Sequence, residues 1–198
     1  MRANCYIVTV PGTDFALVID PGEYSEKLRV YLQEAGIKKL DYILLTHAHF
    51  DHITGVNDLK NEYSGKIVIH KSDEPFLSDG EKSLSYILRK PFHPIKADIT
   101  VSDSDVLGFG GETVQVIHTP GHTPGSVCYK IGDSLFSGDT LFRLSAGRTD
   151  FPGGSNIDMK ESMYRLKSIS ENLKVYPGHD ASTELNFERS NNPFMREL

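Results

Sequence analysis

Four short apolar segments of this chain each end in a polar turn that places a metal-binding type of residue just past the segment. The segments and the residues that follow them are YILLT before His47, VQVIHTPG before His122, SLFSG before Asp139 and LKVYPG before His179. Loops at the ends of sheet strands are where rigid scaffolds place functional groups. The recurrence therefore predicts strands that deliver ligands to one common site.

The turn after the first of these segments concentrates further ligands within six positions. They are His47, His49, Asp51 and His52. His47 and His49 are two apart, so an extended chain points both to one side, whereas Asp51 and His52 are adjacent and diverge. Four such groups do not easily converge on one ion, but they suit two ions about 3.5–4 Å apart, as in two-metal hydrolytic sites. Zinc usually takes about four ligands, so the ligands at the other three strand ends complete the two sites.

The remaining pattern predicts sheets covered by helices. Residues 5–10 and 15–20 are expected to form a hairpin, and a helix is expected to end at Gly36. Residues 41–46 have the continuous apolar character of a strand buried on both faces. A helix is expected over residues 156–170 with three side chains inward, namely Ile157, Met163 and Leu166. Residues 72–98 are interpreted as an excursion near the site.

Composition and charge limit the classes of partner. The 198 residues suit one domain, spanning 1–198, and 38% hydrophobic residues indicate a globular protein. The net charge of -6 comes without a concentrated cluster of Lys and Arg, so we expect no nucleic-acid partner. No apolar run has the length of a membrane span or of a secretory signal, so we expect no membrane association and a cytoplasmic location.

The motifs THAHFDH, PGHTPGS, SGDTLF and YPGH resemble those of the metallo-β-lactamase superfamily. The loop GRTDFPGGS, residues 147–155, is similar to that of its glyoxalase II-like branch, which includes hydroxyacylglutathione hydrolases and persulfide dioxygenases. The resemblance extends from VIDPG at 18–22 to NPF at 192–194. It implies an α/β fold, a four-layer αββα sandwich with the site at one edge between the sheets.

The resemblance also implies two divalent metal ions, with zinc expected and iron or manganese as alternatives. The implied ligands are His47, His49 and His122 for the first ion, Asp51, His52 and His179 for the second, and Asp139 as the bridge. Asp20 matches an acid that orients a ligand histidine, although a turn aspartate is an equal interpretation. The other histidines, which are expected to be structural or in loops, are His70, His93 and His118.

The function expected from this resemblance is hydrolysis of small acyl thioesters, such as hydroxyacylglutathione, by a metal-activated hydroxide. Asp51 and Asp139 would hold that hydroxide as the catalytic carboxylates, and Arg148 would pair with a substrate carboxylate. The partner is thus a small-molecule thioester, and the oligomeric state stays open.

One departure and three alternatives accompany this expectation. Glyoxalase II carries a C-terminal helical domain that helps bind glutathione, and this chain ends 19 residues after His179 (198 − 179 = 19), so we expect that domain to be absent. The first alternative is a persulfide dioxygenase with a single iron. The second is a nuclease or phosphodiesterase, which the acidic balance disfavours. The third is a non-enzymatic metal module that serves a partner.

Overall fold

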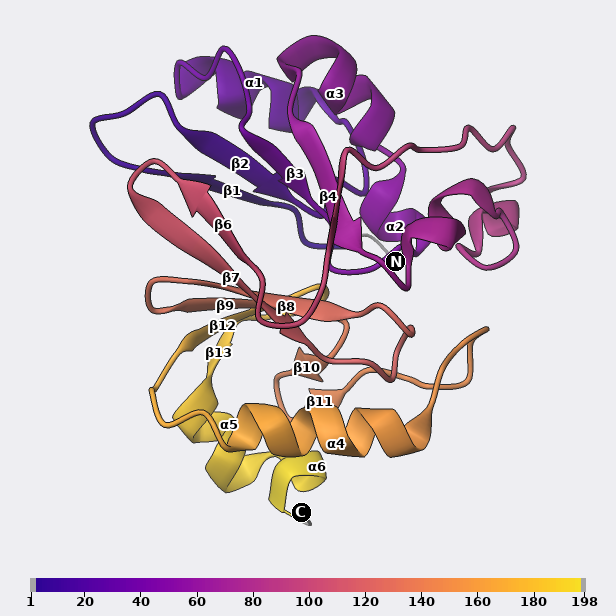
Figure 1. The fold of residues 1–198 in the computed structure, drawn as a ribbon, viewed down its shortest axis with the longest axis vertical. Coiled ribbons are helices and arrows are strands. Elements are labelled where there is room, and N and C mark those ends of the chain that lie inside the picture. The colour runs from indigo at the N-terminus through magenta and orange to yellow at the C-terminus, as the bar shows by residue number, and fades with distance from the viewer. Residues whose placement is uncertain (1–2, 197–198) are drawn as a thin grey trace.

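Two β-sheets lie face to face, and helices cover the outer face of each (Figure 1). The structure is a computed structural model that describes residues 3–196. Its four layers are, in order, a helical layer with α1 and α3, a five-stranded sheet, a six-stranded sheet, and a helical layer with α4, α5 and α6. The expected four-layer αββα sandwich is confirmed.

The first sheet has the order β1-β2-β3-β4-β5. Its strands are β1 (Tyr6–Thr9), β2 (Ala16–Ile19), β3 (Tyr42–Leu44), β4 (Lys66–His70) and β5 (Ile99–Val101). β1 and β2 form the predicted antiparallel hairpin, and the strands from β2 to β5 are parallel. The covering helices are α1 (Glu26–Glu34) and α3 (Val56–Tyr63).

The second sheet has the order β13-β12-β9-β8-β7-β6. Its strands are β6 (Val106–Phe109), β7 (Glu112–His118), β8 (Val127–Ile131), β9 (Ser134–Gly138), β12 (Lys174–Pro177) and β13 (Thr183–Glu184). Between β9 and β12 a small hairpin pairs β10 (Leu141–Phe142) with β11 (Ser145–Ala146). The covering helices are α4 (Asn156–Lys167), α5 (Leu185–Asn191) and α6 (Pro193–Arg196).

The central strands of the first sheet are apolar on both faces because each face packs into a different core. In β2, Leu17 and Ile19 point between the sheets, whereas Ala16 and Val18 lie beneath the helices. β3 and β4 divide their side chains in the same way. Successive residues of a strand point to opposite faces, so a sheet buried on both sides needs continuous apolar runs, as the sequence predicted for residues 41–46.

Helix α4 turns a partly different face inward from the one that the sequence predicted. Met159, Met163 and Leu166, at spacing i, i+4 and i+7, are buried against the second sheet. Ile157 is 72% exposed, so its predicted inward position was wrong, whereas those of Met163 and Leu166 are confirmed. Ile157 precedes Met159 by two residues, and residues two apart do not share a helical face.

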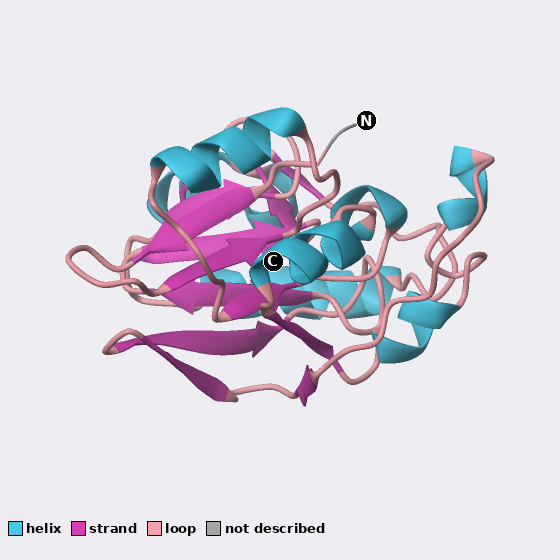
Figure 2. Ribbon diagram, turned by 90° about the horizontal axis from the view of Figure 1, so that it is seen from above, coloured by secondary structure: helices cyan, strands magenta, loops and turns pink. Residues whose placement is uncertain are grey.

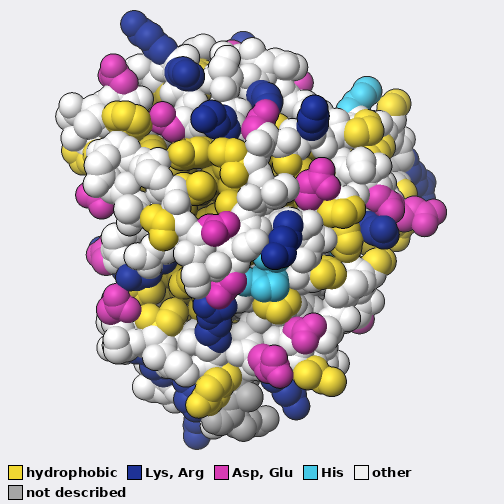
Figure 3. Space-filling model, in the orientation of Figure 1, with side chains coloured by type: hydrophobic (Ala, Val, Ile, Leu, Met, Phe, Trp, Pro, Cys, Tyr) yellow, Lys and Arg dark blue, Asp and Glu magenta, His cyan; other side chains and the backbone are white. Residues whose placement is uncertain are grey.

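Loops and short helices gather at one end of the sandwich, on the right in Figure 2, toward which several strands point. They include α2 (Phe50–Ile53) and two 3₁₀ helices, η1 (Glu74–Ser78) and η2 (Ser85–Leu88), which lie in the expected excursion of residues 72–98. No helix in residues 3–196 combines the length and apolar character that a bilayer crossing requires. On the face shown in Figure 3, acidic and basic side chains are interspersed.

Replacement of Leu166 by alanine should lower the free energy of unfolding by about 2–5 kcal/mol, because it removes a fully buried side chain from a packed core. The matched control is Ile157→Ala on the exposed face of the same helix, which should change stability by less than about 0.5 kcal/mol. Urea unfolding followed by circular dichroism measures both. Equal losses in the two variants would show that α4 packs through another face.

Candidate metal centre

The seven predicted ligands lie together at one edge of the sandwich. Four of them follow the ends of strands, namely His47 after β3, His122 after β7, Asp139 after β9 and His179 after β12. In the second sheet β7, β9 and β12 run in the same direction, because β8 is antiparallel to both its neighbours and β12 is parallel to β9. Their carboxyl ends therefore meet at the same edge, as the strand-end pattern predicted.

The other three predicted ligands belong to a short helix, where the sequence predicted a loop. His49 is the N-cap of α2, and Asp51 and His52 lie within its single turn. Adjacent residues on a helix point about 100° apart. This turn therefore separates Asp51 and His52, as the divergence argument required.

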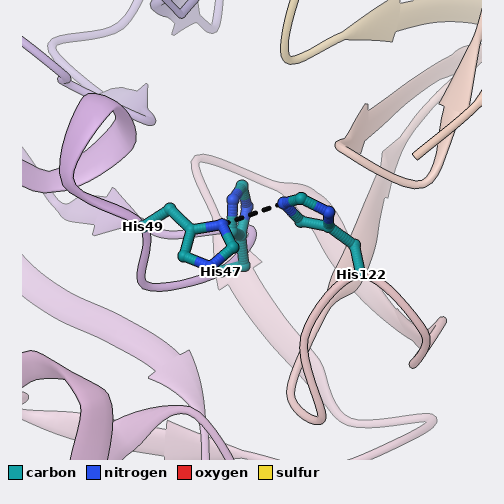
Figure 4. A group of neighbouring side chains, drawn as sticks. All are labelled: His47, His49 and His122. Carbon is teal, nitrogen blue, oxygen red and sulfur yellow. Dashed lines mark hydrogen bonds between the residues drawn. The ribbon is translucent and has the colours of Figure 1, made fainter. Parts of the chain in front are cut away.

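The first group of ligands consists of three histidines whose rings converge (Figure 4). His49 Nδ1 lies 2.9 Å from His122 Nε2, so both nitrogen atoms occupy one small space. The ring of His47 is 4.8 Å from each of the other two rings, centroid to centroid. These are the three histidines that the resemblance assigned to the first ion.

The second group contains Asp51, His52 and His179, and Asp139 lies between the two groups. Asp51 is 3.3 Å from His179 Nε2. Asp139 Oδ1 is 3.5 Å from His52 Nε2, and its other oxygen is 3.5 Å from both His122 Nε2 and His179 Nε2. One carboxylate thus faces histidines of both groups, which is the position that a bridging ligand requires.

The donor atoms fit a metal centre because several of them have no other partner. Four donor atoms are buried and form no hydrogen bond within the described residues, namely Nε2 of His47, His49 and His52 and Oδ1 of Asp139. Unsatisfied buried polar atoms are costly, and a bound cation removes that cost. Gly178 keeps the space open, since a Cβ there would lie 2.2 Å from Asp139 Oδ1.

Asp20 sets the orientation of a histidine in each group. His52 Nδ1 donates to Asp20 Oδ2 at 2.9 Å, which leaves His52 Nε2 to face the site. The hydroxyl of Thr46 donates to the same oxygen at 2.6 Å and lies 3.1 Å from His47 Nδ1, from which it accepts. The interpretation of Asp20 as an orienting acid therefore holds, rather than that of a simple turn residue.

The loop of residues 147–155 contributes through its backbone as well as through a side chain. The Arg148 carbonyl accepts a hydrogen bond from His122 Nδ1 at 2.8 Å, which turns His122 Nε2 toward the site. The Arg148 guanidinium forms two hydrogen bonds of 2.6 Å with Asp150 and lies 4.0 Å over the ring of Phe151. Its predicted pairing with a substrate carboxylate stays a prediction and requires competition with Asp150.

The remaining histidines lie outside the ligand groups. His70 and His118 stack on one another with ring centroids 4.0 Å apart, and His118 Nε2 donates to the Pro124 carbonyl at 2.9 Å. His93 is an exposed loop residue. Within residues 3–196 none of these three joins a metal-type cluster.

Asp73 has a role in the site that the sequence analysis missed. This buried carboxylate accepts from the Ala48 N–H at 3.1 Å, the Thr123 hydroxyl at 2.7 Å and the Gly125 N–H at 2.6 Å. Ala48 lies between two ligand histidines and Thr123 follows a third. Asp73 therefore ties together the two loops that carry the first group. It lies three residues past β4, so it repeats the strand-end pattern that marked the ligands.

The model of the Metallo-beta-lactamase superfamily matches residues 1–179. The chain belongs to the metallo-β-lactamase superfamily. YqgX of Bacillus subtilis (strain 168), a probable metallo-hydrolase, is 34% identical over 199 residues, which cover 98% of this chain and 93% of YqgX. BaeB of Bacillus velezensis, a probable polyketide biosynthesis zinc-dependent hydrolase, is 33% identical over 176 residues, which cover 88% of this chain and 72% of BaeB.

Solved structures of this superfamily share the fold closely. The BLEG-1 B3 metallo-beta-lactamase has a TM-score of 0.87 at 34% identity and covers 98% of this chain and 94% of its own. TTHA1623 in a di-iron-bound form has a TM-score of 0.84 at 35% identity, and the match covers 97% of this chain and 94% of the TTHA1623 chain. ETHE1 from Myxococcus xanthus has a TM-score of 0.75 at 31% identity, and the match covers 96% of this chain and 77% of the ETHE1 chain.

In this superfamily member the first histidine group is neutral in the metal-free protein. Burial, and secondarily the neighbouring His122, lowers the pKa of His49 to about 3. Burial also lowers the pKa of His47 well below its ordinary value and lowers that of His122. Neutral imidazoles are ready ligands, because no proton has to leave before a metal ion binds.

The two histidines of the second group, His52 and His179, have raised pKa values instead. Although burial acts to lower it, the carboxylates of Asp139 and Asp20 raise the pKa of His52 to about 9. Hydrogen bonds to Asp139 and Asp51 raise the pKa of His179 to about 10. At neutral pH these two histidines are therefore protonated and held by the carboxylates that would share their ion.

Metal binding at the two groups should differ in the protons that it releases. An ion at the first group would meet neutral histidines and should release few, whereas an ion at the second group would displace about two protons, from His52 and His179. Because both folded pKa values lie above neutrality, the affinity for the second ion should rise more steeply with pH. Calorimetry in buffers of different ionisation enthalpy counts the protons for each ion. Equal release for both ions would contradict this ordering.

Replacement of Asp73 by alanine should weaken the first ion's binding by about 10- to 100-fold, the usual effect of removing a residue that orients ligands. Competition with a coloured chelator measures this affinity. Glu74→Ala, an exposed neighbour in η1, is the control and should bind metal normally. A variant that lost stability without metal but kept full metal affinity would show that Asp73 only supports the fold.

Proposed function

We propose that this protein is a dinuclear metallohydrolase that cleaves small acyl thioesters such as hydroxyacylglutathione. The position of Asp139 carries the proposal, because its two oxygens face histidines of both ligand groups. A carboxylate shared in this way fits two adjacent ions, the arrangement used for hydrolysis. The names of YqgX and BaeB, a probable metallo-hydrolase and a probable zinc-dependent hydrolase, support the same class.

The chain's own residues position the reacting water and the ions. The two ligand groups would hold two divalent ions, which would supply a water of pKa about 7 and a Lewis acid for the substrate carbonyl. Asp51 and Asp139 offer carboxylate oxygens in the site, which would accept hydrogen bonds from that water and orient it. Asp20 and the Arg148 carbonyl keep the ligand rings turned toward the site, so the arrangement is fixed before substrate binds.

A thioester suits this arrangement because its leaving group departs without assistance. The water loses one proton to solvent as its oxygen adds to the carbonyl carbon, and the carbon–sulfur bond then breaks with its electron pair on sulfur. The carboxylic acid that forms passes its proton to solvent or to the thiolate, so the products are a carboxylate and a thiolate or thiol. A thiol has a pKa of about 8.5, so the thiolate needs little help from a general acid.

Zinc is the metal that we propose, and the zinc-dependent description of BaeB supports it. The di-iron form of TTHA1623 supports iron as the alternative occupant of the same ligands. The histidine and carboxylate donors suit both metals.

A persulfide dioxygenase with one iron is the second candidate function. Its support is the likeness to ETHE1 at 31% identity, together with the GRTDF loop at 147–151. The two candidates differ in metal count and in the co-substrate, since only the dioxygenase consumes oxygen.

Metal analysis combined with a substrate panel should show about two ions per chain and turnover of acyl thioesters without oxygen uptake. The panel also includes a β-lactam, a lactone and glutathione persulfide. Asp139→Ala should lose metal and nearly all thioester turnover, because one carboxylate serves both ions. His93→Ala is the control and should retain both. A plateau at one iron with oxygen consumption on persulfide would establish the dioxygenase instead.

A further inference from the structure

A groove of about 960 Å³ opens beside the second ligand group. It includes Asp51, a predicted ligand, and Asp180, which follows the ligand His179. One wall comes from β1 and the start of α1, and another from Leu88 and Lys90 at the end of the 72–98 excursion. The volume lies at the upper end of the range for small-molecule sites, about 300–1,000 Å³, so it exceeds what a short acyl group needs.

The wall next to the metal centre is held in place by the chain's first described residues. The backbone N–H of Asn4 donates to the Gly178 carbonyl at 2.6 Å, and the Asn4 side chain donates to the carbonyls of Pro177 and Asp180. The hydroxyl of Tyr6 donates to the Pro177 carbonyl at 2.6 Å. Asn4 and Tyr6 both line the groove, so its wall and the His179 loop form one unit.

Charged side chains of both signs line the groove. Glu23 and Asp180 lie at the metal end, because Glu23 follows Gly22, which contacts the Asp51 backbone, and Asp180 follows a ligand. Lys27 and Lys90 come from two separate elements, α1 and the loop after η2. Both are exposed, and within residues 3–196 neither forms an ion pair.

The groove is also lined by apolar and aromatic side chains. They include Ile7, Leu28, Tyr31, Phe50, Leu88 and Tyr176. Leu88 is 36% exposed and Tyr31 is 61% exposed, so a bound chain has apolar surface to cover. The Arg148 side chain, by contrast, already pairs with Asp150.

We infer that the groove binds a long thioester substrate whose apolar middle lies along this lining and whose terminal anion pairs with Lys27 and Lys90. The inference rests on the proposed thioester hydrolysis and names its substrate class. The scissile bond lies at the metal end, and the anion, a phosphate or a carboxylate, lies at the distant end of the thiol portion. Two lysines that belong to different elements and lack partners on an acidic protein provide the complementary charge.

The test uses one acyl group on four thiols with the metal-loaded protein. The thiols are N-acetylcysteamine (short and neutral), pantetheine (long and neutral), phosphopantetheine (long with a phosphate) and glutathione (with carboxylates). We expect kcat/KM to rise from the short to the long neutral thiol and again with an anion. Comparison of the last two substrates identifies the preferred anion.

The double variant Lys27→Ala/Lys90→Ala should raise KM for the anionic thioesters by about tenfold, since each exposed ion pair contributes a few-fold. It should leave the neutral thioesters unchanged. Lys38→Ala/Lys39→Ala, two exposed lysines beyond α1, is the matched control and should change neither. With the wild-type protein, added salt should raise KM only for the anionic substrates, because it screens their attraction to the two lysines.

Non-hydrolysable thioether analogues separate this inference from the proposed function. If no thioester is cleaved, the proposed function fails, and calorimetry with the pantetheine and phosphopantetheine thioethers still measures the groove. Tighter binding of the phosphorylated analogue, lost in the double lysine variant, would support the groove assignment. Equal turnover of short, long and anionic thioesters would overturn the groove assignment. So would a rise in KM in the double lysine variant that is the same for neutral and anionic substrates. Either result would leave the proposed hydrolysis intact.

Discussion

One buried carboxylate, that of Asp20, connects the sheet to the metal centre. It follows β2 in the first sheet, and its left-handed backbone (φ +51°) is a conformation that aspartate tolerates better than most residues. One of its oxygens accepts the Thr46 N–H at 2.8 Å, and the other serves the Thr46 hydroxyl and His52. The apolar packing of β2 therefore fixes where two ligand histidines point, before any ion is present.

The segment of residues 72–98 has two roles at its two ends. Near its start, Asp73 joins the loops of the first ligand group, and near its end Leu88 and Lys90 form a wall of the groove. A single excursion from the first sheet thus braces the chemistry and shapes the approach to it. A substitution near Leu88 or Lys90 can therefore alter the groove while the contacts of Asp73 stay in place.

The residue pattern predicted sheets covered by helices and ligands gathered at strand ends because both depend on local patterns, whereas the four-layer order followed from the family resemblance. Apolar runs report strands, and ligand residues just past those runs share an edge once the strands align. The failures have non-local causes. Asp73 bonds to atoms 25, 50 and 52 positions away, which no spacing reveals. Ile157 was expected to be buried because it is hydrophobic, but its position along the helix places it on the exposed face. The contact of His122 with the Arg148 carbonyl uses the backbone, so the type of residue at position 148 does not reveal it.

The contact between Asn4 and Gly178 joins residues that lie far apart along the chain. Synthesis proceeds from the N-terminus, so the segment that braces the His179 loop is made well before that loop. The three histidines of the first group precede His179 along the chain, and so does Arg148, whose carbonyl orients His122. The growing chain therefore contains every donor of the first group before the second group is complete.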